Sequence, residues 1–283
     1  MSAALALPVK GQMTADQIRA VLDGWQSRIT LKNVGRGHHY VCDGAKKGCA
    51  SVTTRMGARV SPRLIDWSSR VEREACIETA WRLMRQDAIA MPEDREAFAA
   101  RFGALAGQER ENQKQLREAG ELGTEVHALI EWHLKTKLGI AMPEPKVSDR
   151  AIAIFGDFER WADSVDLEPI AMEFRLFHRA KNYGGTGDLA AFATLPGKPR
   201  RLGIGDYKTS KGIWPEMRIQ SGAYRAAWEE MGLPPAFGFL IHLPKEGEGV
   251  GTVQVHEVEE PLEDLMAAFD AHSQLHGFYG RYR

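Results

Sequence analysis

The spacing of apolar residues changes along the chain from a helical period to a strand-like alternation. In much of the first 164 residues, outside the 38–53 stretch, apolar positions recur every three or four residues, as in Leu64, Trp67, Val71 and Ala75, which is typical of a helix with one buried face. From residue 171 to residue 208 they alternate with polar positions, which indicates strands. The pattern predicts helices at 14–25, 62–85, 93–118, 124–137, 149–164, 215–231 and 261–275, and strands at 171–177, 187–194, 201–208, 237–242 and 252–258.

Cap residues set the predicted ends of two helices. Pro62 suits the first turn of a helix because its missing N–H would have no partner there. Ser148 is a candidate N-cap for the 149–164 helix. Within that helix Ile152, Phe155 and Trp161 are expected to face inward.

Turn signals divide the rest of the chain. Alternation within 38–53, interrupted by 43–44 and 46–48, predicts a hairpin. The charged helix at 93–118 is expected to break or bend at Gly103 and Gly107. Helices therefore come first, then three strands, a helix, two strands and a helix. This order predicts an α/β protein with a mixed central sheet flanked by helices.

Length and composition favour one enzyme-sized unit. The chain has 283 residues and 43% apolar content, enough for one substantial core with a smaller lobe built from the first third. No apolar run approaches the roughly 20 residues of a membrane span, and residues 3–8 lack a basic leader and an adequate apolar region for secretion. We expect a cytoplasmic protein with no membrane partner.

The cysteines argue against two kinds of site. Cys42, Cys49 and Cys76 are an odd number and contain no close C-x-x-C pair. A disulfide framework and a four-thiolate zinc or iron–sulfur site are therefore both disfavoured. Reduced, partly buried thiols are the expected state.

Charge is balanced overall and uneven locally. The net charge is −1, whereas residues 1–60 carry nine Lys or Arg against three acids, and residues 195–225 carry seven against two. Such segments allow a polyanion to be held locally by a neutral chain. Ordinary solvated surface charge is the alternative.

Four short patterns follow one another: Gly123 to His127, Gly187-Asp188, Asp206-Tyr207-Lys208 and Gln220-x-x-x-Tyr224. A D/E-x-K triplet alone is expected by chance about once in a chain of this size, and 144–146 is such a copy inside a Pro-flanked connection. The 206–208 copy differs because it ends an alternating strand. Alternation puts its acid and its lysine on one face, about 6 to 7 Å apart along the backbone.

These residue types suit phosphodiester hydrolysis. If neighbouring strands pair, Asp188 lies beside Asp206, and the two offer hard oxygen donors suited to Mg²⁺ or Mn²⁺. The metal polarises the phosphoryl oxygen and activates a water, and Lys208 positions that water or opposes developing charge. Two structural alternatives stay open: Asp188 as a turn-capping residue after 184–187, and an exposed Asp206–Lys208 ion pair.

Two helices contribute further candidates. His127 and Glu131 lie four residues apart on one helix face; a neutral imidazole is a common metal ligand, although a lone helical histidine is usually structural. Gln220 and Tyr224 are also four apart, on the helix after the Lys208 strand. They are expected to contact DNA phosphates or the groups around the site, with core packing of Tyr224 as the alternative.

Taken in order, the patterns resemble the RecB-like branch of the PD-(D/E)XK nuclease superfamily. The matching residues are Gly123 to His127, Glu173, Gly187-Asp188, Asp206 to Thr209, Gln220 and Tyr224, within about residues 120–230. The 40–54 hairpin, ending Ser51-Val52-Thr53-Thr54, and the Trp67 helix more loosely resemble the front end of phage and mitochondrial exonucleases of this branch.

The resemblance implies a restriction-endonuclease-like αβββαβ core at 120–283, with a hairpin and helical lobe at 1–119 contributing to DNA binding. It implies one or two Mg²⁺ or Mn²⁺ ions, held by His127, Asp188, Asp206 and the Tyr207 carbonyl, with Asp188, Asp206 and Lys208 catalytic. Further residues are expected to bind DNA or to surround the site: Glu131, Glu173, Thr209, Ser210, Lys211, Gln220 and Tyr224.

Family members process DNA ends in recombination, repair or replication, so the expected function is a DNA exonuclease, of a phage or prophage type. Iron–sulfur members have four cysteines around the core, and this chain has three, all before residue 80; no cluster is expected. No helicase motor is present, which implies either a stand-alone nuclease or a subunit that works with a partner. A recombination protein or a single-strand-binding protein is the expected kind of partner.

Other readings stay open. One is an endonuclease or single-strand-specific nuclease with the same site, and another is a non-catalytic DNA-binding or scaffolding protein. The 188–206 connection, with Lys198, Arg200 and Arg201, is either a DNA-contacting hairpin or an exposed loop.

Overall fold

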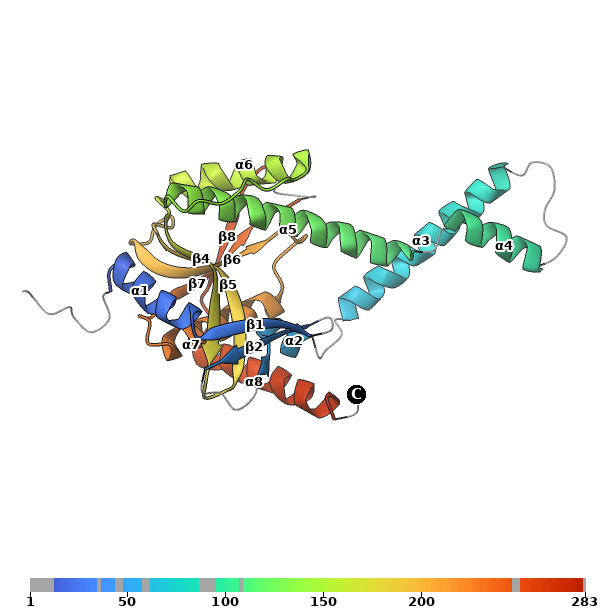
Figure 1. Cartoon of the computed structure of the whole chain (residues 1–283). Helices are drawn as coiled ribbons and strands as arrows, with labels where there is room; N and C mark the ends of the chain where they lie inside the picture. Colours follow the sequence, from blue (N-terminus) through green and yellow to red (C-terminus); the bar gives the residue numbers. More distant parts are fainter. Residues whose placement is uncertain are drawn as a thin grey trace, which may run out of the picture. The chain divides into compact units, whose positions relative to one another are not determined.

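The computed structural model describes residues 13–34, 37–43, 48–57, 62–86, 95–106, 109–245 and 250–281. Its elements are, in chain order (Figure 1), α1 (Ala15–Gln26), β1 (Ile29–Val34), β2 (Gly37–Cys42), β3 (Cys49–Ala50), α2 (Val52–Met56), α3 (Pro62–Gln86), α4 (Arg95–Ala106), α5 (Glu111–Lys137), α6 (Asp149–Ser164), β4 (Glu168–His178), β5 (Tyr183–Ala193), β6 (Arg201–Lys208), α7 (Pro215–Glu230), β7 (Phe237–His242), β8 (Gln254–Val258) and α8 (Leu262–Tyr279). The predicted turn at 44–47 and the predicted break at Gly107 lie outside the described residues.

The larger of the two sheets is a five-stranded mixed sheet. Its order is β4-β5-β6-β7-β8, with β6 and β7 parallel and the other three pairs antiparallel. Parallel neighbours require a crossover connection, and α7 supplies it between β6 and β7. The expected α/β class with a mixed central sheet is confirmed, and the succession of α6, three strands, α7 and β7 follows the predicted order.

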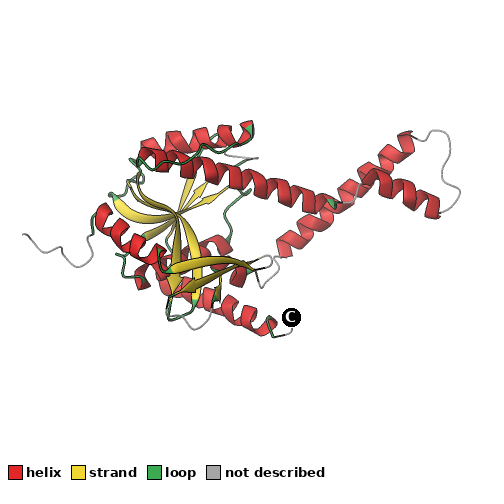
Figure 2. Cartoon of the chain, in the orientation of Figure 1, coloured by secondary structure: helices red, strands yellow, loops and turns green. Residues whose placement is uncertain are grey.

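Helices pack on both faces of this sheet (Figure 2). On one face Trp228 of α7 is fully buried in a cluster with Leu202 and Ile204 of β6. On the other, Phe158 of α6 meets the ring of Tyr207 edge-on, with ring centroids 5.7 Å apart. Alternate residues of β6 thus contact different helices, as a strand buried on both sides requires.

One predicted face of α6 is wrong. Ser148 is its N-cap as expected, since the Ser148 hydroxyl accepts from the Ala151 N–H. Phe155 is buried, but Ile152 is 52% exposed. At about 100° per residue, Ile152 lies about 120° around the helix from Phe158, which is fully buried, and so falls outside the buried face.

β5 begins at Tyr183, so Gly184 and Gly185 lie within the strand and not in a turn. The turn-capping alternative for Asp188 is therefore wrong. A Cβ on Gly184 would come within 2.5 Å of the Tyr40 ring, and one on Gly185 within 2.5 Å of the Tyr224 ring. Glycine is needed here so that two buried tyrosines can cover the strand.

The first 59 residues cluster with this sheet rather than with the helices that follow. The chain divides into two compact units, residues 1–59 with 123–283 (the sheet unit) and residues 60–122 (the helical unit). Gln26, at the end of α1, pairs with the backbone of Arg175 in β4 through both its amide oxygen and its amide nitrogen. The division differs from the predicted boundary at 119/120 because α1 and β1 to β3 pack on the sheet.

The early hairpin also differs in detail from its prediction. β1 and β2 pair from Ile29↔Cys42 to Val34↔Gly37, and β2 pairs with the two-residue β3. The predicted strand at 50–53 is replaced by the short helix α2, whose N-cap is Ser51. A hydroxyl that accepts from Thr54 N–H explains why the chain turns helical there.

The helical unit consists of α3, α4 and the beginning of α5. Pro62 opens α3 as predicted. The end of α4 at Ala106 agrees with a predicted break near residue 107, and α4 continues through Gly103. The predicted separation between the 93–118 and 124–137 helices is wrong, because α5 runs without interruption through Gly120 and Gly123. Glycine weakens a helix by about 1 kcal/mol, which is too little to break one of this length. Among the described residues, no helix is both long and apolar enough to cross a membrane.

Candidate active site

Asp206 and Lys208, at the end of β6, form an ion pair. The pair confirms that they share one strand face, as alternation predicted. It is not an exposed surface pair, since only 6% of the Asp206 side chain and 17% of the Lys208 side chain reach solvent. Partly buried charges of this kind are costly unless paired or bound to an ion, so the exposed-pair alternative does not hold.

The site lies where β5 and β6 separate. Their ladder ends at Leu189↔Gly205, whereas β6 stays paired with β7 up to Lys208↔His242. The backbone of Tyr207 therefore lacks a β5 partner. Its N–H donates to Asp188 Oδ2 at 2.9 Å, and its carbonyl oxygen lies 3.2 Å from His127 Nε2. Two side chains thus satisfy the backbone groups that the ladder leaves open.

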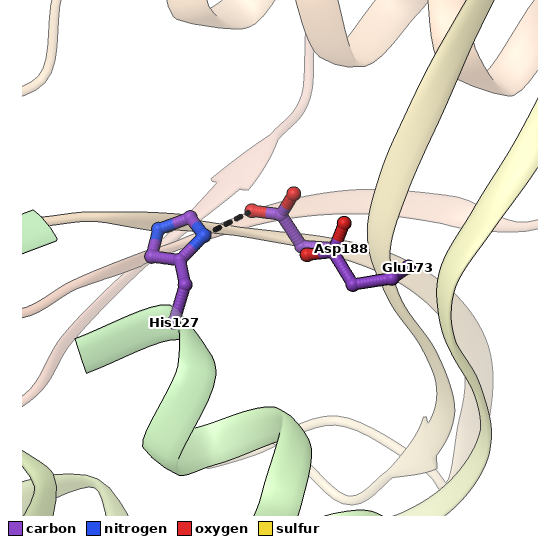
Figure 3. A group of neighbouring side chains, drawn as sticks. All are labelled: His127, Glu173 and Asp188. Atoms are coloured by element: carbon purple, nitrogen blue, oxygen red, sulfur yellow. Dashed lines mark ion pairs between the residues drawn. The ribbon is translucent and has the colours of Figure 1, made fainter. Parts of the chain in front are cut away.

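Three acids lie in a row across adjacent strands. Glu173 of β4 lies between Met172 and Phe174, which pair with Leu189 and Gly187 on either side of Asp188 in β5. Asp206 of β6 directly follows Gly205, the last β6 residue that pairs with β5. One ligand atom each from His127, Glu173 and Asp188 lie within 4.8 Å of one another, and His127 Nδ1 is 3.7 Å from Asp188 Oδ2 (Figure 3). Two strands and one helix thus aim one nitrogen and two carboxylates at a common volume.

Glu173 is held in an unusual backbone conformation. Its φ is +49°, in the left-handed region that residues with a Cβ rarely adopt. Its neighbours in β4 keep their register, with Met172 opposite Leu189 and Phe174 opposite Gly187. Strain of this kind persists only where the surroundings impose it, and it gathers at functional sites.

The acids disfavour one another's charge. Burial, then the nearby Asp206, raise the pKa of Asp188 well above its usual range, with Lys208 opposing the shift. Glu173 keeps contact with solvent, yet burial and the charges of Glu131 and Asp206 raise its pKa to about 7. Carboxylates that repel one another in this way are stabilised in their charged form by a bound cation.

His127 approaches β6 because α5 carries a glycine one turn earlier. A Cβ on Gly123 would lie 3.0 Å from the Thr209 hydroxyl, so glycine leaves room for the helix beside the end of β6. Burial lowers the pKa of His127, which favours the neutral imidazole that binds metals. Its ring also meets the Tyr207 ring edge-on.

Lys208 is linked to α7 through two predicted residues. Its ammonium donates to Gln220 Oε1 at 3.2 Å, and Gln220 Nε2 donates to the Tyr224 hydroxyl at 3.0 Å. Burial lowers the pKa of Lys208, but Asp206 and Asp188 outweigh it and leave the pKa raised. The lysine is therefore held as a cation. Tyr224 is also buried, so it packs in the core and takes part in this chain of hydrogen bonds.

The other predicted residues fall into two groups. Glu131 pairs with Lys135 one turn along α5, and its charge acts on Glu173. Thr209, Ser210 and Lys211 form the loop that leaves β6; the Ser210 hydroxyl donates to the Gly212 carbonyl, and Lys211 is exposed.

The basic turn between β5 and β6 contacts acidic residues of the chain itself. Arg200 pairs with Asp166 and Glu168, while Arg201 and Lys198 pair with Glu257. Arg201 starts β6 and Lys208 ends it, so about 23 Å of strand separates them. These contacts favour the structural alternative for this turn over a DNA-contacting hairpin.

The second D/E-x-K copy is an internal reference. Glu144 and Lys146 are exposed and lie in the connection between α5 and α6, outside any helix or strand. The same spelling therefore occurs once at the end of β6, beside Asp188 and Glu173, and once in an exposed loop. Position in the fold, and not the triplet, distinguishes them.

The donor set fits a small hard divalent cation. Carboxylate oxygens and one neutral imidazole are ligands for Mg²⁺ or Mn²⁺, and the set contains no thiolate of the kind that soft metals prefer. Glu173 enters this group although the sequence assigned it only a surrounding role, because no sequence signal reports a left-handed residue in a strand. Comparison of the chain with protein-family models and with curated proteins finds no match.

Proposed function

We propose that the chain is a divalent-metal-dependent DNA nuclease of the RecB-like, PD-(D/E)XK type that hydrolyses phosphodiester bonds at DNA ends. The observation that carries this proposal is the convergence of His127, Glu173 and Asp188 beside the buried Asp206–Lys208 pair. Carboxyl groups whose pKa is raised by burial and by neighbouring acids, as in Asp188 and Glu173, beside a fixed cation, are typical of catalytic sites.

Each residue has a distinct role in this proposal. His127, Glu173 and Asp188 hold the metal, with Asp206 and the Tyr207 carbonyl next to them. A bound Mg²⁺ or Mn²⁺ polarises the phosphoryl oxygen and lowers the pKa of a water. Lys208 stays protonated and opposes the negative charge that develops on the phosphoryl group. Gln220 fixes the direction of the Lys208 ammonium.

The proposal that the substrate is DNA, and that cleavage starts at its ends, rests on the order of the motifs along the chain.

Glu144→Gln and Lys146→Ala supply a matched control, because they remove the exposed copy of the triplet and leave Asp206 and Lys208 intact. The test incubates end-labelled linear DNA beside a covalently closed circle, with Mg²⁺, with Mn²⁺ and with EDTA.

Wild type and the Glu144→Gln, Lys146→Ala variant are expected to degrade linear DNA only with metal and to spare the circle. Lys208→Ala is expected to keep metal binding, measured by calorimetry with Mn²⁺, and to lose about 10²- to 10³-fold in rate, the effect of removing one group that stabilises transition-state charge. Asp206→Asn is expected to be equally inactive. Full activity of Lys208→Ala, or no metal-dependent degradation by wild type, would contradict the proposal; cutting of the circle would identify an endonuclease.

A further inference from the structure

The loop between β6 and α7 joins two parts of the proposed site. It runs from Thr209 to Trp214, directly after Lys208 and directly before the helix that carries Gln220. Its exposed residues Lys211 and Trp214 offer a cation and an aromatic ring, the groups that bind nucleic-acid phosphates and bases. The conformation of this loop therefore affects any strand that reaches the site.

A buried histidine on the neighbouring strand holds this loop. His242 ends β7, opposite Lys208 in the parallel register, and is 4% exposed. Its Nε2 lies 2.7 Å from the Ser210 carbonyl. A carbonyl only accepts, so Nε2 carries the proton and donates it. The Leu243 N–H donates to the Lys208 carbonyl at 2.8 Å, which ties the two strand ends together at the same point.

The ring of His242 is itself oriented. Its Nδ1 faces the side-chain amide of Gln254 in β8 at 3.3 Å. The His256 ring lies 6.0 Å away, and its buried Nε2 has no hydrogen-bond partner among the described residues. Two histidines thus lie side by side, and of the two His242 is the one whose ring donates to the loop, through the Ser210 carbonyl.

We propose that His242 is a positioning residue, which holds the Thr209–Trp214 loop in the conformation that binds the substrate strand. This inference rests on the proposed function. Losing one buried hydrogen bond to the loop backbone is expected to raise KM for DNA about tenfold, with little change in kcat, because the proposed metal ligands and Lys208 keep their contacts.

Two amide variants separate this role from simple space filling. His242→Gln places an amide N–H where Nε2 stands and is expected to restore the bond to Ser210, whereas the shorter His242→Asn does not reach it. His256→Leu is the matched control, since it alters the adjacent ring without touching the loop. Thermal unfolding of each variant shows that the fold is kept.

A second readout does not depend on catalysis. Trypsin cleaves after Lys211 only when the loop can leave the surface, so native-state digestion followed by mass spectrometry reports its release. His242→Asn is expected to be cut there faster than wild type, His242→Gln and His256→Leu at the wild-type rate. Gln254→Ala, which keeps the ring but removes its Nδ1 contact, is expected to give a smaller increase.

Equal tryptic cleavage and equal KM in wild type and His242→Asn would overturn the proposal. An increase in KM in His256→Leu as large as that in His242→Asn would also overturn it, because the effect would then come from general packing. If wild type does not degrade DNA, the proposed function fails. The rate of tryptic cleavage after Lys211 still decides whether His242 holds the loop.

Discussion

The sheet unit and the helical unit stabilise themselves in different ways. The sheet unit buries large rings completely, including Trp228, Tyr183 and Phe269. In the helical unit α4 buries no side chain, and α3 leaves Ile77, Trp81 and Met84 more than half exposed along one face. A continuous close-packed core holds its side chains in defined positions, whereas helices with few buried contacts open more easily. The candidate active site lies in the first kind of structure, as precise chemistry requires.

The largest expected difference between the units comes from tryptophan removal. Trp228→Ala deletes a fully buried ring whose indole N–H donates to the Pro234 carbonyl at 2.8 Å. The loss is expected to be about 3 to 5 kcal/mol of unfolding free energy. Trp81→Ala, at a ring that is 55% exposed, is expected to change it by about 0.5 kcal/mol or less. Urea unfolding followed by circular dichroism measures both, and equal losses would remove the distinction.

Glycine substitutions are expected to have opposite signs in the two units. Gly184→Ala puts a methyl group 2.5 Å from the buried Tyr40 ring, and such overpacking costs about 1 to 3 kcal/mol. Gly103→Ala in α4 meets no atom within 4 Å and is expected to stabilise its helix by up to about 1 kcal/mol. Melting temperatures check the signs: a fall for Gly184→Ala and a rise for Gly103→Ala. A stabilising Gly184→Ala would mean that the Tyr40 ring can move aside.

Ion pairs give the smallest difference. The bidentate Arg201 contact lowers the pKa of Glu257, which is only 18% exposed. The stabilisation is present above the unfolded carboxyl pKa of about 4.3 and is lost as the pH falls through the lower folded value. Glu257→Gln should therefore destabilise at pH 7, by about 1 kcal/mol or less, and have no effect near pH 2. Glu109→Gln, at the solvent-exposed Arg117 pair of the helical unit, should lose any effect in 1 M NaCl because salt screens such pairs. Urea midpoints across pH and salt check both variants.

Much of the sheet unit follows from local sequence. Alternation alone put Asp206 and Lys208 on one face, and the pairing of β5 with β6 brings Asp188 next to them. The class, the strand order along the chain and the Ser148 cap were predicted for the same reason, because they depend on residues close in sequence. The place of 144–146 in a connection was predicted from its proline.

The failures have a shared physical cause. A turn at Gly184 and Gly185 stayed an open alternative in the sequence because the ring partners of these glycines, Tyr40 and Tyr224, lie far away in sequence. The predicted boundary at 119/120 does not separate the first 59 residues from the helical unit, because their packing on β4 depends on long-range contacts such as Gln26 with Arg175. His242 carries no motif, since its only signal is a partner in the parallel strand register. Tertiary contacts decide each of these, and a local pattern does not contain them.

The separation of β5 from β6 has an evolutionary consequence. Asp188 and His127 complete the backbone of Tyr207 as well as offering ligand atoms, and a buried backbone group without a partner costs about 1 to 3 kcal/mol. A descendant that lost its chemistry would still be selected to keep both residues for folding. Their retention in a relative is thus weak evidence of activity. Lys208 is the more informative position to compare, because its ammonium contacts the side chains of Gln220 and Asp206 and, in the described part of the chain, no backbone group.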